Sequence, residues 1–196
     1  ALGPLHAAGF IHRDIKPENI FVADDGTYLL DLGIVKDTRA DKRLTTDAVG
    51  TPMYMSPEQA FGQSIDHRAD VWSLGLVLYE ALTGRAPTEA ESMGQVFELI
   101  REAAFPAISD PEVPSDLAAF VLTMISRHAA HRPEGMHLVY DVLSRYANST
   151  LLARYPRPPA PPSTNEGDVP RKNTLPQGSS PSEPPPSFDH AAGSIP

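Results

Sequence analysis

The segment that most constrains the fold runs from Asp70 to Thr83, where "DVWSLGLVLYEALT" is apolar on nearly every side of a helix. A helix without a polar face is normally buried inside its domain. Gly84 follows at once, and glycine is the residue that most often ends a helix in the left-handed conformation. We therefore expect a buried central helix around which the other elements pack.

Four more helical segments are predicted, and apolar residues at helical spacing indicate the last three. They are the end of a helix at residues 1–9, followed by 91–103, 115–129 and 133–147. Ser115-Asp116 are candidates for the N-cap of the helix at 115–129, and Pro133 is typical of the first turn of the helix at 133–147. The predicted domain is thus mainly α-helical.

A single β-hairpin is predicted near the start of the chain. Two short apolar runs within residues 19–31 are joined by Asp24-Asp25-Gly26, and Asp-Gly is a strong turn signal. The following residues, 33–57, show no periodicity, and a loop of that length inside a compact domain is usually functional.

Proline divides the chain of 196 residues, because 12 of its 21 prolines fall in residues 156–196. This Pro-, Ser- and Gly-rich segment cannot bury enough apolar surface to offset its ordering entropy. We predict a folded domain over residues 1–150 and a disordered tail over residues 151–196. The tail contains P-x-x-P spacings at Pro156, Pro159 and Pro162 that would suit an aromatic groove. A solvated linker is the preferred interpretation.

Charge and composition exclude several classes of protein. The net charge of −9 argues against a nucleic-acid partner or an anionic membrane surface. The chain has no cysteine, which excludes disulfides and thiolate metal sites. No apolar stretch reaches the roughly 18 residues that span a bilayer. We expect a cytoplasmic protein without a membrane segment in this chain.

The stretch "HRDIKPENI", His12 to Ile20, concentrates chemically useful side chains. It places Asp14, Lys16 and Asn19 within six residues, and the predicted hairpin would bring Asp31 beside Asn19. An amide oxygen and a carboxylate together suit Mg²⁺ that holds phosphates. Asp14 could accept a proton, and Lys16 could neutralise a transferring phosphoryl group. These are the parts that phosphoryl transfer requires.

Five stretches in order resemble the motifs of the eukaryotic-type (Hanks-type) serine/threonine protein kinases. His12-Arg13-Asp14 with Asn19 resembles their catalytic loop, and Asp31-Leu32-Gly33 resembles their magnesium motif with Leu in place of Phe. The other three are "GTPMYMSPE" at residues 50–58, "DVWSLG" at residues 70–75 and Arg132-Pro133. The motifs cover residues 1 to about 147, and their style is similar to bacterial members of the family.

The resemblance implies a role for each catalytic residue. Asp14 would orient and deprotonate a substrate hydroxyl, and Lys16 would contact the γ-phosphate of ATP. Asn19 and Asp31 would hold Mg²⁺-ATP. Thr51 would bond Asp14 and Lys16, and with Lys16 it indicates the serine/threonine class. The implied cofactors are therefore ATP and Mg²⁺, and the implied partners are protein substrates.

Further residues receive supporting or regulatory roles from the resemblance. Phe21 would lie beneath the adenine, although an ordinary strand core residue is an equal alternative. Arg13 could receive a phosphate on Thr45 or Thr46, and we hypothesise autophosphorylation there. Unchanged activity of a Thr45→Ala/Thr46→Ala double variant would argue against it.

Three other residues are expected to be structural. Glu58 and Arg132 should form a buried ion pair, and Asp70 should accept backbone N–H bonds from the catalytic loop. His12 is expected to pack rather than to take part in catalysis.

The family also needs a β-rich N-terminal lobe with a Gly-rich phosphate cover and a Lys–Glu pair. Only 13 residues precede Asp14, so we expect a C-terminal kinase lobe whose N-terminal lobe is absent here and lies upstream. Two functions remain open: a serine/threonine kinase, or a truncated lobe that acts as a binding or scaffold module. A Gly-rich loop and a strand Lys encoded upstream would favour the enzyme.

Overall fold

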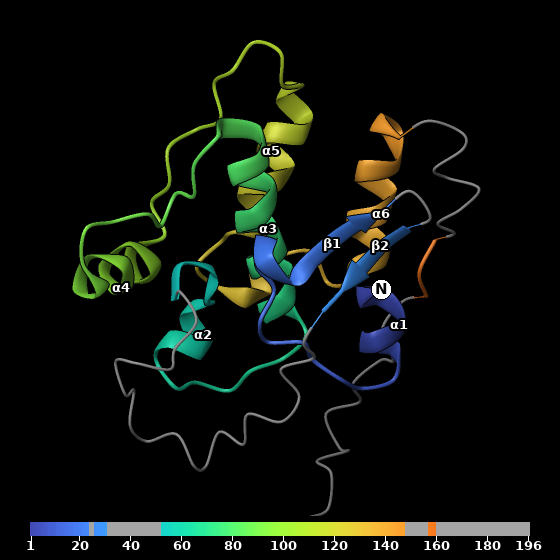
Figure 1. The fold of residues 1–196 in the computed structure, drawn as a ribbon, viewed down its shortest axis with the longest axis horizontal. Helices are drawn as coiled ribbons and strands as arrows, with labels where there is room; N and C mark the ends of the chain where they lie inside the picture. The colour runs from blue at the N-terminus through green and yellow to red at the C-terminus, as the bar shows by residue number, and fades with distance from the viewer. Residues whose placement is uncertain (24–25, 31–51, 148–156, 160–196) are drawn as a thin grey trace, which may run out of the picture. The chain divides into compact units, whose positions relative to one another are not determined.

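The computed structural model describes residues 1–23, 26–30, 52–147 and 157–159 (Figure 1). Most of the predicted tail, residues 31–32 and residues 33–51 of the predicted loop lie outside the described part. Within that part, no helix combines the length and the apolar character needed to cross a membrane.

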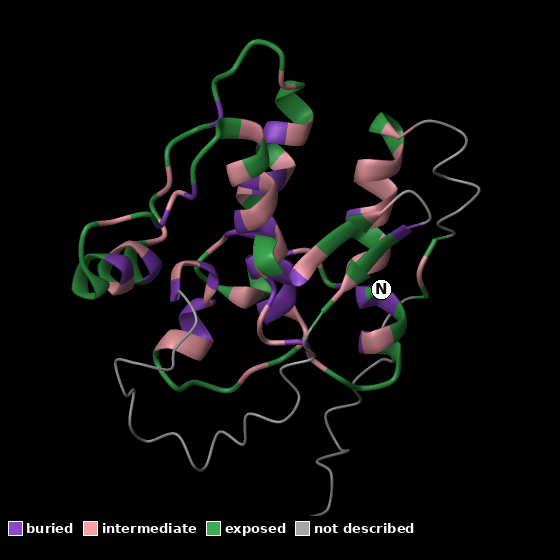
Figure 2. Ribbon diagram, in the orientation of Figure 1, coloured by how far each residue is buried: buried purple, intermediate pink, exposed green. Residues whose placement is uncertain are grey.

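The central element is α3, Arg68–Thr83, and Gly84 ends it with a left-handed backbone at φ 80°. The Gly84 N–H donates to the carbonyl of Glu80 at 2.7 Å. Trp72 and Leu76 of this helix are completely buried. The predicted buried helix is therefore confirmed, and Figure 2 shows the buried residues of α3 in purple.

Three further helices pack around α3: α4 (Met93–Glu102), α5 (Ser115–Met124) and α6 (Met136–Leu143). The buried side chains form two groups, and α3 contributes to both. Its Trp72 and Leu76 belong to the larger group, and its Val71 belongs to the smaller. A helix that faces two apolar clusters has no side left for a polar stripe, which explains its composition.

The close packing of α3 on α5 depends on Gly75. A Cβ at this position would lie 2.7 Å from Cγ2 of Ile125 and 2.8 Å from Cβ of Met124. Neither distance is compatible with ordinary van der Waals contact. Gly75 therefore permits the two helices to approach each other.

The starts of two predicted helices and the end of one differ from the sequence pattern. Ser115 is the first residue of α5 rather than a cap, and the helix is ten residues long and ends at Met124 instead of reaching 129. Helix α6 starts at Met136, not at Pro133, because the backbone is still fully extended at Gly135 (φ −172°, ψ 171°) and helical geometry begins only after it.

The hairpin consists of β1 (Ile20–Ala23) and β2 (Gly26–Leu29), paired antiparallel with Ile20 opposite Leu29 and Ala23 opposite Gly26. This confirms the predicted mainly helical class with one small hairpin. Two short helices, α1 (Leu2–Ala7) and α2 (Pro57–Ala60), flank the functional loop in sequence. One-turn 3₁₀ segments occur at Pro17–Asn19, Pro52–Tyr54, Ala129–His131 and Ser144–Tyr146.

Candidate active site

The backbone at the start of the loop from His12 to Asn19 is hydrogen-bonded to one carboxylate at the start of α3. The Oδ2 of Asp70 accepts the backbone N–H of His12 at 2.8 Å, and its Oδ1 accepts that of Arg13 at 2.8 Å. Asp70 is completely buried. A charged acceptor bonds backbone N–H groups more strongly than a neutral one, and a buried site removes competing water.

Asp70 is itself bonded to α1. Nε2 of His6 lies 2.7 Å from Asp70 Oδ2, and both side chains are buried. The same carboxylate thus joins the helix before the loop, the loop itself and the central helix. Because each contact limits the others, the loop has little freedom to move independently of the core.

Arg13 adopts a left-handed backbone, with φ 67°, which is uncommon for a residue with a side chain. Its N–H donates to Asp70, and its carbonyl accepts a bond from Nε2 of Gln59 at 2.8 Å. Bonds on both sides of the residue hold it in this conformation. Such strain persists only where surrounding contacts determine it, and it is common at active sites.

The side chains of Lys16 and Asn19 converge on Asp14. Its Oδ2 accepts a bond from Nζ of Lys16 at 3.1 Å and from Nδ2 of Asn19 at 3.0 Å, and Asn19 also bonds the Asp14 carbonyl at 2.8 Å. The side chain of Asp14 is 32% exposed and that of Lys16 is 16% exposed. The carboxylate is therefore positioned by its neighbours and still open to a substrate.

The hairpin brings the end of the loop beside the residue that precedes Asp31. The N–H of Leu30 donates to the carbonyl of Asn19 at 2.9 Å. The next residue, the predicted metal ligand Asp31, lies outside the described residues. The described strands thus place Leu30 beside Asn19, and the proximity of Asp31 to Asn19 stays a prediction.

Glu58 and Arg132 form the buried ion pair that the sequence suggested. Two parallel hydrogen bonds of 2.6 and 2.9 Å join the guanidinium to the carboxylate, and the Arg132 side chain also lies over the ring of Trp72 at 4.9 Å. Burial acts to raise the pKa of Glu58, but the hydrogen bonds and charge of Arg132 outweigh it and hold that pKa below its usual value. The pair fastens α2 to the core.

The segment Pro52–Tyr54 is hydrogen-bonded to α3 as well. The hydroxyl of Tyr54 donates to Glu80 at 2.5 Å, and the hydroxyl of Ser73 donates to the Tyr54 carbonyl at 2.7 Å. Burial, together with the adjacent carboxylate of Glu80, raises the pKa of Tyr54 above its ordinary value. The phenol thus stays protonated and serves as a donor.

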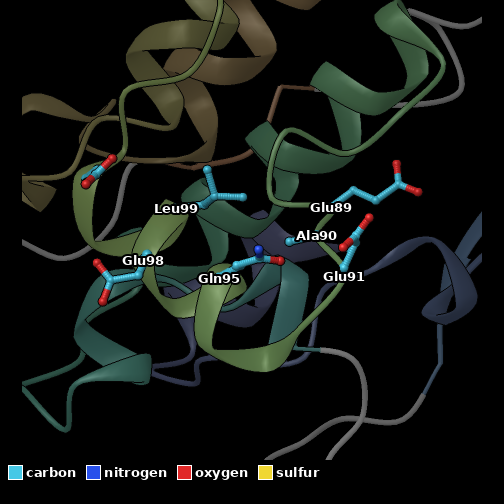
Figure 3. Close-up of a pocket in the computed structure, with 7 residues that line it drawn as sticks. Glu89, Ala90, Glu91, Gln95, Glu98 and Leu99 are labelled. Atoms are coloured by element: carbon cyan, nitrogen blue, oxygen red, sulfur yellow. The ribbon is translucent and has the colours of Figure 1, made fainter.

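A hollow beside α4 is a separate feature. Four glutamates and three uncharged residues line it: Glu89, Ala90, Glu91, Gln95, Glu98, Leu99 and Glu102 (Figure 3). None of these is a predicted catalytic residue. A surface with four carboxylates repels phosphate groups, so this hollow is unsuited to hold a nucleotide.

Comparison with known proteins assigns the family. The protein kinase domain model matches residues 1–143. The chain belongs to the protein kinase family.

Several bacterial relatives support this membership. The chain is 38% identical over 177 residues to a probable serine/threonine-protein kinase of Corynebacterium efficiens, covering 84% of this chain and 27% of the relative. It is 37% identical over 153 residues to a probable serine/threonine-protein kinase of Clostridium acetobutylicum, covering 76% and 23%. It is 36% identical over 186 residues to serine/threonine-protein kinase PknH of Mycobacterium tuberculosis, covering 84% and 29%. The chain therefore spans less than a third of the length of these relatives.

The structure of this kinase-family chain brings Asp14, Lys16 and Asn19 together and places Asp70 behind them. Thr45, Thr46 and Thr51, like Asp31, lie outside the described residues, so their roles stay predictions. Phe21 lies on β1 and is 55% exposed. That exposure argues against the alternative of an ordinary core residue.

The described part of the predicted metal site fits Mg²⁺. The amide nitrogen of Asn19 bonds Asp14, so the amide oxygen is not used in these bonds and would be the atom available to a metal ion. An amide oxygen is a hard donor of the kind Mg²⁺ prefers. Among the described residues, no group of three or more His, Asp or Glu side chains is placed to hold a metal ion. The predicted ligands, the amide of Asn19 and the carboxylate of Asp31, include only one side chain of these types, so they would not form such a group.

Two residues near the site were missed by sequence reasoning. His6 carries no local signal, because its contact with Asp70 joins residues 64 positions apart. Gln59 could have been found in part, since Ser56 and Gln59 form a capping box at the start of α2. That pattern predicts the short helix but not the bond from Gln59 to Arg13.

Proposed function

We propose that this chain supplies the catalytic loop of a serine/threonine protein kinase that phosphorylates hydroxyl groups of protein substrates. The observation that carries the proposal is the convergence of Lys16 and Asn19 on the partly exposed carboxylate of Asp14. The names of the bacterial relatives, all serine/threonine-protein kinases, support the same class.

Asp14 acts first on the substrate. Its carboxylate accepts a hydrogen bond from the Ser or Thr hydroxyl and takes the proton as the hydroxyl oxygen bonds to phosphorus. Mg²⁺-ATP, when bound, would supply the electrophilic γ-phosphoryl group, with ADP as the leaving group. Lys16 would stabilise the negative charge on the transferring group, and Asn19 with Asp31 would provide oxygen ligands for the metal.

The surroundings of the loop explain why the base is in place before substrate arrives. Asp70 and Gln59 fix the backbone of Arg13, the residue immediately before Asp14. A catalytic group held in position costs little reorganisation in the transition state. The buried Glu58–Arg132 pair secures α2, which carries Gln59.

The experiment compares Asp14→Asn with the unaltered protein that carries this chain. We expect Mg²⁺-ATP-dependent phosphate incorporation into a protein substrate to fall about 10²–10⁴-fold, the usual contribution of a general base. Asp110→Asn is the matched control, because Asp110 lies exposed in the α4–α5 connection and its carboxylate bonds the nearby N–H of Glu112.

Equal activity of Asp14→Asn and the unaltered protein would refute the proposed base. Mg²⁺-ATP-independent binding of a protein partner, with no phosphate incorporation by either form, would instead support the alternative scaffold module.

A further inference from the structure

The segment Arg157–Pro159, which we call the strap, lies against the folded domain although the sequence assigns it to the tail. It is seen as the isolated orange segment near α1 in Figure 1. Two consecutive residues of the strap contact two different helices. That arrangement points to a docking site rather than to a chance surface contact.

The first contact joins the strap to α6. The guanidinium of Arg157 donates from Nε to Oδ1 of Asp141 at 2.6 Å and from Nη2 to Oδ2 at 2.6 Å. These bonds hold the pKa of the Asp141 carboxyl below its usual value. Both side chains are about half exposed, at 52% and 40%. Exposed ion pairs are weak in general, but a bidentate arginine–carboxylate pair fixes direction as well as distance.

The second contact joins the strap to α1. Pro158 occupies the space that a side chain at Gly3 would need: a Cβ there would overlap Cβ of Pro158 and lie 3.1 Å from its Cγ. Gly3 is buried within the helix, where glycine is otherwise an unfavourable residue. The ring of Pro158 therefore packs directly on the backbone of α1.

Helix α1 leads into the functional loop. It carries His6, whose ring bonds the Asp70 carboxylate that holds the loop backbone. Helix α1 is thus connected to the loop backbone through two hydrogen bonds, from His6 to Asp70 and from the N–H of His12 to Asp70. The strap reaches this helix from a position 16 residues beyond Asp141.

We propose that the surface formed by Gly3 of α1 and Asp141 of α6 is an intramolecular docking site for the chain's own Arg157-Pro158 pair. The docked strap clamps α1 against α6 and so supports the helix that precedes the catalytic loop. Release of the strap loosens α1 without unfolding the central helix.

The first test reverses the charges of the ion pair and follows amide hydrogen exchange by mass spectrometry or NMR. The reporters are the N–H groups of Ala8 and Phe10, which bond the carbonyls of Pro4 and Leu5 at the end of α1. Arg157→Asp should raise their exchange rates about two- to fivefold, the size of effect typical of an exposed pair.

Two further variants make this test specific. Asp141→Arg combined with Arg157→Asp restores opposite charges and should return the exchange rates of the α1 reporters toward the native values. Arg101→Asp is the control, since Arg101 forms an equally exposed pair with Glu98 on α4. It should leave α1 unchanged. Unaltered exchange in Arg157→Asp, or no recovery in the double variant, overturns the proposal.

The second test examines the contact between Gly3 and Pro158. Gly3→Ala should expel the strap and accelerate exchange at the same reporters, although alanine favours helix. Gly94→Ala in α4 is the matched control, because a Cβ there meets nothing within 4 Å, so exchange in α4 should be unchanged or slower.

The decisive comparison places Gly3→Ala in a Pro158→Gly background. With the proline ring removed, the added methyl group should no longer accelerate exchange in α1. If Gly3→Ala has the same effect in both backgrounds, its cost arises elsewhere and Pro158 does not dock on α1. None of these readouts depends on kinase activity.

Discussion

The Glu58–Arg132 pair offers the sharpest test of what holds the site together. Replacing Arg132 with Met keeps an unbranched side chain of similar length and removes the charge. The Arg132 side chain is completely buried and that of Glu58 is 8% exposed, so the variant leaves a carboxylate in an apolar setting. Breaking a buried pair in this way costs about 3–5 kcal/mol.

Backbone groups add to this cost. Besides Glu58, the guanidinium donates to the carbonyls of Arg68, Ser126 and Arg127 at 2.8–3.1 Å. All five of its N–H groups are therefore used. Since the variant deprives three carbonyls of their donor, we place its loss of unfolding free energy at the upper end of about 3–5 kcal/mol.

The assay is equilibrium urea unfolding of the protein that carries this chain, with Arg101→Met as control. Arg101 forms an exposed pair with Glu98 on α4, and its replacement should change the unfolding free energy by no more than about 0.5 kcal/mol. A loss below about 1 kcal/mol for Arg132→Met would refute the reasoning, because it would mean that the pair contributes no more than a surface contact.

The pH dependence provides an independent check. The folded pKa of Glu58 is depressed, so its ionisation stabilises the native protein above the unfolded pKa, and this contribution is lost as pH falls through the folded value. Arg132→Met removes the hydrogen bonds and the charge of Arg132, so burial weighs more heavily against the remaining hydrogen bonds of Glu58 and its pKa rises relative to the native protein. The difference between the two proteins should therefore be largest near neutral pH and shrink below about pH 5. A difference that grows toward acid would contradict this.

Two further variants probe helix packing and capping. Gly75→Ala should lower the unfolding free energy by about 1–3 kcal/mol, because its Cβ would press on Met124 and Ile125; a stabilised protein in thermal unfolding would show that α3 and α5 can separate at no cost. Ser56→Ala removes the side chain that accepts the N–H of Gln59 at 3.4 Å and should cost about 1 kcal/mol. Urea unfolding measures it, and a neutral result would mean that α2 does not depend on its cap.

Local chemistry was sufficient to predict a large part of the fold. The helix ending at Gly84 and the Asp-Gly hairpin follow from patterns within a few residues, and both are present in the structure. The loop residues Asp14, Lys16 and Asn19 also meet as expected. Their spacing of two and five positions, with Pro17 between them, leaves the short loop few other arrangements.

Helix boundaries were less predictable because distant groups compete for the backbone. Helix α5 ends at Met124, before the carbonyls of Ser126 and Arg127, which accept bonds from Arg132. Gly135 is extended between Pro133 and α6, so α6 starts late. A pattern of apolar residues contains no information about that competition.

The sequence by itself thus determined the types of element, their order and the identity of the side chains gathered in the His12–Asn19 loop. Tertiary structure decided what holds that loop: His6, Gln59 and Asp70 come from three separate helices and meet only after the chain has folded. It also explains the glycine at position 3, since Pro158, from the segment that follows α6 in sequence, lies against it. Contacts between residues so far apart in sequence depend on packing, which no local propensity contains.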